Sequence, residues 1–282
     1  MDAIERVEIS IKTKLIYEMS HSYGPFGYTI PSSLPELRIE EHSKLIETIQ
    51  NEVDRSKEEF VAHFKKKYGD EHKYLPLWMS GEIMSFGSML TMFKGTDSKL
   101  KWKIAKDYGI NTKILGSWLQ ALNVIRNICA HHSRLWNKEL GYRAILPYDD
   151  IDPDWYLPVP IVDVRKKLSK KFVLSKFELL NGRLDEFFVC TARNDIYCKD
   201  NTYDKVKGSN LPEKIKIDLK NLIQPNQRVF VILTILKYML NVICPQSNWK
   251  QRLYEFLDEY PDIPRLNMGF PENWKENNIW KK

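Results

Sequence analysis

The chain of 282 residues is long enough to bury a large core in one domain or in two. With 43% hydrophobic and 28% charged residues, its composition is that of a globular protein and excludes a disordered or fibrous one. The formal net charge of +6 suits a polyanionic partner such as nucleic acid without requiring one.

Three features predict a cytoplasmic protein that does not enter a membrane. The first residues, Met1–Arg6, are partly acidic and contain no apolar run, so we expect no secretory signal. The most apolar stretch, Val229–Cys244, has only 16 residues and contains Lys237, whereas a bilayer span needs about 20. The four cysteines show neither a C-x-x-C pair nor a zinc spacing, which predicts thiols in a reducing cytoplasm and no metal or other cofactor.

Helical periodicity dominates the first half of the chain. Apolar residues recur at helical spacing over residues 3–22, 41–54, 56–68, 77–93 and 99–108. Gly24-Pro25 is expected to end the first helix, and Ser56–Glu59 has the pattern of a capping box that begins the third. Pro76 fits the first turn of the fourth helix, and Gly109 ends the fifth.

The next predicted helix carries the most informative residues. Asn111 has the side chain of a helix cap, and the apolar face behind it consists of Ile114, Leu115, Trp118, Leu119, Leu122, Ile125 and Cys129. No segment before residue 145 alternates as a strand would. The tryptophans at 78, 102, 118 and 136 are expected to anchor the core or an interface.

The pattern changes after Leu146, where prolines and aspartates predict a loop. Helical spacing resumes over residues 227–243 and 249–260 and is followed by an aromatic tail. We therefore expect an all-α fold in three parts. These are a helical core over 1–148, an insertion or accessory region over 149–225, and C-terminal helices over 226–282 whose tail packs on the core.

The predicted motif helix ends in an Arg-Asn-x-x-x-His arrangement: Arg126, Asn127, His131, the adjacent His132, and Arg134 beyond. Histidine exchanges a proton near neutral pH, and arginine stays charged and holds two phosphate oxygens. RNA cleavage by the neighbouring 2′-hydroxyl needs those two abilities and no metal. No D-x-D or E-x-x-H pairing suggests a two-metal nuclease instead.

The spacing of the motif leaves its geometry open. On a straight helix, residues five apart differ by about 140°, so Arg126 and His131 do not share a face, whereas Asn127, His131 and Arg134 do. Either the helix frays near Ala130 or the site combines two copies of the motif across a dimer interface. We favour the dimer because it supplies two histidines, one as base and one as acid. A purely structural alternative is that these basic residues complement the helix dipole.

Residues 121–137, which surround this motif, closely resemble the signature of the Abi family of AbiD/AbiF-like abortive-infection proteins. Their R-N-x-x-x-H element is similar to that of HEPN ribonucleases, including the nuclease centres of type VI CRISPR effectors. The resemblance covers residues 1–148 and about 226–282. Further matching segments are Ala3–Arg6, Tyr23–Gly27, Leu75–Trp78, Ser85–Gly87 and Gly269–Trp274.

The resemblance implies a HEPN-like helical bundle that acts as a homodimeric, metal-independent endoribonuclease in antiviral defence or as a toxin. By this resemblance, Arg126 contacts the scissile phosphate, Asn127 orients the pair, His131 is the general acid/base and His132 supports it. Arg134 is expected to bind RNA. A restraining antitoxin, either a protein or a small RNA, is a partner that the resemblance leaves open.

One departure from the family supports an alternative function. Family members usually carry a further N-terminal segment before the equivalent of Ala3–Arg6, where this sequence starts. A truncated or degenerate member would be a non-catalytic helical module that binds RNA or a protein.

A lysine-rich segment lies inside the predicted accessory region. Lys166, Lys167, Lys170 and Lys171 stand near Phe172, so they fit phosphate contacts with base stacking, and they fit a solvated helix face equally well.

Overall fold

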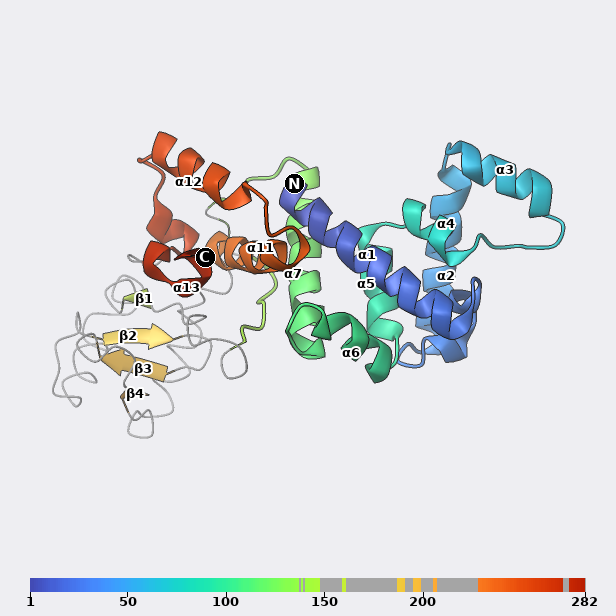
Figure 1. Cartoon of the computed structure of the whole chain (residues 1–282), viewed down its shortest axis with the longest axis horizontal. Coiled ribbons are helices and arrows are strands. Elements are labelled where there is room, and N and C mark those ends of the chain that lie inside the picture. The colour runs from blue at the N-terminus through green and yellow to red at the C-terminus, as the bar shows by residue number, and fades with distance from the viewer. Residues whose placement is uncertain are drawn as a thin grey trace. The chain divides into compact units, whose positions relative to one another are not determined.

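Helices dominate the described part of the chain, which confirms the predicted all-α class. The computed structural model describes residues 1–136, 138, 140–147, 228–270 and 274–281, together with short strands at 159–160, 187–190, 195–198 and 205–206 (Figure 1). These residues fall into two compact units. One unit comprises Met1–Asn127 with Met239–Ser247, and the other comprises Ile128–Tyr238 with Asn248–Lys282.

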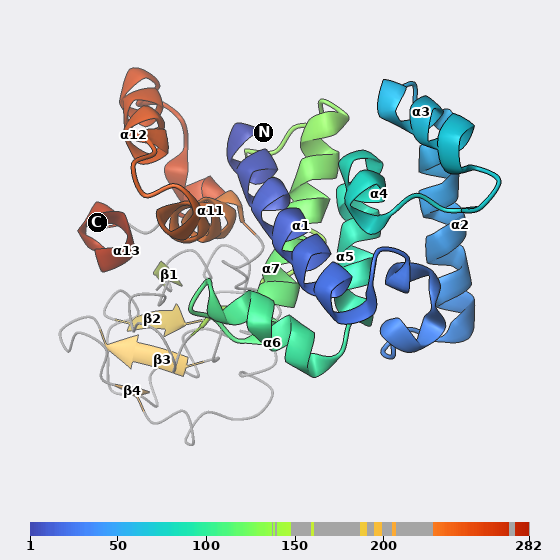
Figure 2. The same ribbon diagram turned by 45° about the vertical axis from the view of Figure 1, so that its right-hand side comes forward.

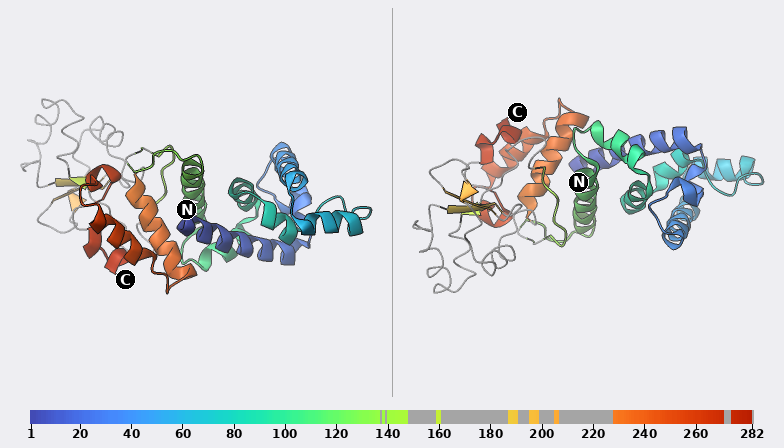
Figure 3. Two further views of the ribbon diagram at one scale, coloured as in Figure 1. Left: turned by 90° about the horizontal axis from the view of Figure 1, so that it is seen from above. Right: turned by 90° about the horizontal axis from the view of Figure 1, so that it is seen from below.

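Helix α1 (Asp2–Tyr23) is central to the first unit, where it contacts α4, α5 and α6 (Figures 2 and 3). Its inward stripe is buried as the periodicity predicts: Ile4, Val7, Ile11, Leu15 and Met19. Gly24 follows the helix with φ of 76°, a left-handed conformation that glycine adopts without strain. A side chain at Gly81 of α4 would collide with Ile16, so this glycine permits the close approach of α1 and α4.

The junction between α2 (Ile39–Arg55) and α3 (Glu59–Tyr68) differs from the prediction. Ser56 does not begin α3 through a capping box; it lies at the C-cap of α2, and α3 begins at Glu59. Ser56 Oγ accepts a hydrogen bond from the backbone N–H of Glu58, 3.3 Å away, which is a local turn. The predicted end at Gly69 is confirmed.

The prediction of a single helix over 77–93 is wrong, because the chain forms α4 (Leu77–Ile83) and α5 (Phe86–Gly95) instead. Ser85 separates them as the N-cap of α5, and its Oγ accepts a hydrogen bond from the Ser88 N–H at 3.2 Å. Glu52 of α2 accepts a second bond from the Ser85 N–H, also at 3.2 Å. Capping by a side chain therefore outweighs the continuous apolar pattern.

The loop between α1 and α2 contains the short helices η1 (Gly27–Thr29) and η2 (Pro31–Ser33) and a buried polar cluster. The Tyr28 hydroxyl donates to the Leu75 carbonyl at 2.8 Å. His42, to which the sequence assigns no role, is 4% exposed and places Nε2 3.0 Å from the Tyr28 carbonyl. These bonds satisfy groups whose burial would otherwise be costly.

Helices α6 (Ser98–Lys106) and α7 (Thr112–Ala130) complete the first half of the chain. Asn111 caps α7 as predicted, since its Oδ1 accepts from the Ile114 N–H at 2.9 Å. Trp118 is fully buried and is a core residue. The other three tryptophans predicted as anchors are not core residues: Trp78, Trp102 and Trp136 are 51%, 57% and 40% exposed.

In the second unit, an aromatic cluster joins the start of α11 (Val229–Ile243) to α12 (Trp249–Glu259) and the C-terminal tail. The tail comprises η8 (Arg265–Met268), η9 (Trp274–Glu276) and α13 (Asn278–Lys281). The ring of Phe230 lies 4.5 Å from that of Phe270 and 5.7 Å from that of Trp280, and Tyr254 meets Trp274 edge-on at 5.2 Å. The predicted packing of this tail on residues 1–148 stays a prediction.

Helix α11 buries Lys237, whose side chain is 5% exposed. Burial lowers the pKa of this ammonium group, and the charge of Lys250 lowers it further. Among the described residues, no helix is long and apolar enough to cross a membrane.

Short strands lie within the predicted accessory region, and the sequence did not indicate them. Strands β1 (Val159–Pro160), β2 (Phe187–Cys190), β3 (Asp195–Cys198) and β4 (Lys205–Val206) pair antiparallel in that order. Aromatic and β-branched residues in β2 and β3 favour this pairing. The rest of 149–225 is outside the described residues, so the insertion stays a prediction.

Replacing Ser85 with alanine should lower the free energy of unfolding by about 1 kcal/mol, because the first turn of α5 loses its side-chain cap. The measurement is urea unfolding followed by circular dichroism. Ser22→Ala, at an exposed position at the end of α1, is the matched control and should change stability little. Equal stability of the two variants would show that Ser85 does not decide the break between α4 and α5.

Candidate functional site

Burial of one face of α7 positions the residues of the motif. Leu115, Trp118, Leu119 and Leu122 are fully buried, and Ile125 is 2% exposed. This face fixes the rotation of the helix about its axis. Arg126, one residue further, is therefore half-buried, and Asn127 is exposed.

The helix ends at Ala130 in a defined turn that holds both histidines. The Ser133 N–H donates to the Ile128 carbonyl and the His132 N–H to the Cys129 carbonyl, both at 3.0 Å. His132 has φ of 51°, and it is the one described non-glycine residue with positive φ. This pair of bonds with a left-handed residue is a Schellman motif, in which glycine is the usual residue. His131 is thus the last residue before the chain reverses.

The polar side chains at this helix end are accessible to a ligand. Asn127, His131, His132 and Arg134 are all exposed. Within the described part of the chain, none of these four side chains, nor that of Arg126, forms a hydrogen bond or an ion pair. Contacts to the helix end therefore do not hold these side chains, and the structural alternative is an interaction of the basic groups with the helix dipole.

The structure also corrects the expected relation of Arg134 to the helix. A straight helix would place Arg134 on the face of Asn127 and His131, but α7 ends at Ala130 and Arg134 lies in the irregular segment after the turn. Arg126 and Asn127 lie in the last turns of α7, and the two histidines follow directly. The two-copy site stays a prediction.

The segment after the turn is anchored by apolar side chains that the sequence analysis did not single out. Leu140, Ala144 and Leu146 are 2%, 1% and 4% exposed. Their spacing is irregular, so no helical or strand periodicity marks them as buried. The left-handed His132 was also missed, because no glycine or asparagine signals the turn.

The predicted lysines at 166, 167, 170 and 171 lie outside the described residues. Across the described ranges, no three His, Cys, Asp or Glu side chains gather closely enough to hold a metal ion. Of the four cysteines, Cys129 and Cys244 have described side chains, and both are free thiols.

Comparison with known proteins supports the resemblance to the Abi family in the first half of the chain. Residues 1–137 match the family model described as Abi-like protein. The matched Abi-like segment includes Arg126, Asn127, His131, His132 and Arg134. No curated protein matches the chain, and no solved structure matches it.

Replacing His132 with glycine should raise the free energy of unfolding by about 1 kcal/mol, because glycine adopts the left-handed conformation without a Cβ clash. Urea unfolding measures the change. Ser133→Gly, at the next exposed position, is the control and should give no gain. A loss of stability in the His132 variant would mean that its imidazole makes a stabilising contact.

Proposed function

We propose that the chain is a metal-independent endoribonuclease of the abortive-infection type. The observation that carries the proposal is the end of α7, where exposed histidines without side-chain partners in the described chain follow a half-buried arginine. The Abi-like match over residues 1–137 supports an abortive-infection role. The HEPN-like character of the bundle is part of the same proposal.

The proposed chemistry is attack by the 2′-hydroxyl of the substrate on the adjacent phosphorus. One imidazole takes the 2′ proton, the P–O5′ bond breaks, and a second imidazole gives a proton to the departing 5′-oxygen. Arg126 neutralises charge on the non-bridging oxygens, and Asn127 orients the reacting groups by hydrogen bonds. The products are a 2′,3′-cyclic phosphate and a 5′-hydroxyl.

Two copies of the chain account for the two proton-transfer groups. His131 directly follows α7, which ends at Ala130. If the helix is continued ideally by one residue, Arg126 and His131 differ by about 140° around its axis, which argues against one copy aiming both side chains at one phosphate. A two-fold dimer in which the two α7 ends meet supplies two histidines and two arginines to one substrate. We therefore propose a homodimer with one shared site.

Purified protein should cleave total RNA in EDTA and leave 2′,3′-cyclic phosphate and 5′-hydroxyl ends, because the motif provides acid, base and cation without metal ligands. His131→Ala and Arg126→Ala should each lower the rate, the former about 10²–10⁴-fold. End mapping by ligation and gel electrophoresis distinguishes the products.

Circular dichroism checks that both variants fold, since a folded and inactive variant separates chemistry from structure. Lys44→Gln, at an exposed position on α2, is a matched surface control that should retain wild-type activity. A strict magnesium requirement or 5′-phosphate ends would rule out the mechanism. A folded wild-type protein that binds RNA without cleaving it would establish the non-catalytic module instead.

Co-expression of wild-type and His131→Ala subunits tests the shared site. If one site needs both histidines, an equal mixture retains about one quarter of the activity, because only wild-type homodimers are active. Independent sites would retain about one half. Light scattering gives the mass of the assembly, which should be twice 33.4 kDa. A monomer, or a linear dependence on wild-type fraction, would refute the dimeric arrangement.

A further inference from the structure

The outer face of α6 presents a solvent-exposed tryptophan between two lysines. Lys99, Trp102 and Lys106 are spaced i, i+3 and i+7, so they lie within about 60° of one another around the helix. All three are exposed, and Trp102 retains 57% of its accessible surface. Lys106 Nζ lies over the indole ring, 4.9 Å from its centroid.

This exposure does not come from a poorly packed helix. The inward residues Leu100, Ile104 and Ala105 are 3%, 0% and 1% exposed, and α6 packs against α1 in the first unit. The helix therefore buries a complete apolar face, and Trp102 is additional to it. A single exposed aromatic side chain is ordinary on a protein surface, so the inference rests on the position of Trp102 between two exposed lysines.

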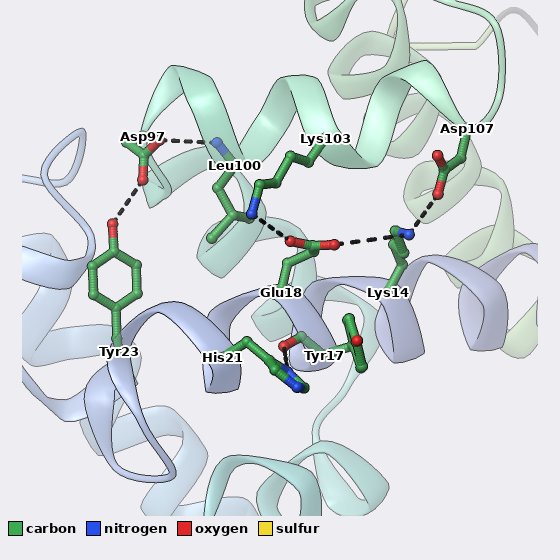
Figure 4. A network of polar contacts seen from close by, with 9 residues as sticks. All are labelled: Lys14, Tyr17, Glu18, His21, Tyr23, Asp97, Leu100, Lys103 and Asp107. Atoms are coloured by element: carbon green, nitrogen blue, oxygen red, sulfur yellow. Dashed lines mark hydrogen bonds and ion pairs between the residues drawn. The ribbon is translucent and has the colours of Figure 1, made fainter.

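The carboxylates that contact α6 already have partners (Figure 4). Glu18 lies 2.9 Å from Lys103, and Asp107 lies 2.6 Å from Lys14, whose pKa the hydrogen bond to Asp107 raises. Glu36 pairs with Lys101 at 2.9 Å.

Asp97 is also engaged, since it accepts hydrogen bonds from the Tyr23 hydroxyl at 2.7 Å and from the Leu100 N–H at 2.9 Å. In the described chain, the ammonium groups of Lys99 and Lys106 consequently have no carboxylate partner. The helix itself carries four lysines and no acidic residue. Its outer face is a positive surface centred on an aromatic ring.

We propose that this face, Lys99–Trp102–Lys106, binds single-stranded RNA, with a base stacked on Trp102 in place of the Lys106 ammonium group and phosphates held by the two lysines. The lysines are about 10 Å apart along the helix axis, enough for two or three nucleotides. A base reaches an indole only when it is unstacked, so a duplex does not fit. The inference rests on the proposed function, which supplies RNA as the substrate, and assigns part of the binding surface for it.

Binding is tested in the His131→Ala background with EDTA, so that the probe stays intact. The probe is a 12-nucleotide oligouridylate with a 5′ fluorescein, followed by anisotropy at several potassium chloride concentrations. Trp102→Ala should weaken binding about tenfold at every salt concentration, because stacking is lost. Lys99→Gln with Lys106→Gln should reduce the slope of log K against log salt by about 1.4, because two phosphate contacts are lost.

Matched controls distinguish an effect of this face from the effect of removing any exposed tryptophan or any exposed lysine. Trp78→Ala removes a tryptophan of similar exposure, 51%, and Lys44→Gln removes an exposed lysine of α2. Both should leave affinity and salt slope unchanged. Equal binding by the Trp102 and Trp78 variants would overturn the proposal, as would tighter binding of a duplex or equal competition by polyglutamate.

The cleavage assay in EDTA gives an independent result. Cleavage by the wild type together with normal binding by Trp102→Ala would refute the proposed RNA-binding surface on α6 and support the proposed ribonuclease function. RNA binding that depends on Trp102, without any cleavage by the wild type, would support the α6 surface and refute the ribonuclease function.

Discussion

The buried face of α7 is the constraint on which the placement of the motif depends. Leu115, Trp118, Leu119 and Leu122 lose essentially all contact with solvent, so the helix cannot rotate or slide without exposing them. Burial of four large apolar side chains is worth several kcal/mol. The cap at Asn111 fixes where the helix begins, and the turn at His132 fixes where it ends. Arg126 thus occupies a defined position on α7, and the two histidines follow the helix in the turn that ends it.

The turn after α7 shows a conflict between local stability and side-chain chemistry. Position 132 is left-handed, which costs a non-glycine residue free energy, and yet it carries an imidazole that has no partner in the described chain. Strain of this kind persists where the surrounding structure or a function maintains it. The two backbone bonds from His132 and Ser133 supply the structural support, and the proposed chemistry supplies the reason for a histidine.

The lysines on the two sides of α6 have different surroundings in the first unit. On the inner side of α6, Lys103 and the nearby Lys14 meet carboxylates and join this helix to α1. On the outer side of α6, the ammonium groups of Lys99 and Lys106 meet no carboxylate of the described chain. Exposed ion pairs contribute little stability, so the pattern matters more for the field it leaves at the surface than for the fold. The net charge of +6 alone does not reveal this division.

The sequence by itself determined the helices whose apolar residues recur regularly and whose ends carry strong signals, such as α1 before Gly24 and α7 after Asn111. It also determined the Arg-Asn-x-x-x-His motif as a pattern, because residue identity and spacing define that pattern without reference to the fold. Only the tertiary structure showed that Ser85 divides a continuous apolar run, since its local cap on α5 is joined by a bond from its backbone N–H to Glu52 of another helix. Burial of Trp118 and exposure of Trp102 likewise depend on which helix faces meet. Periodicity places a residue on a face of a helix, but the neighbouring elements decide whether that face is covered.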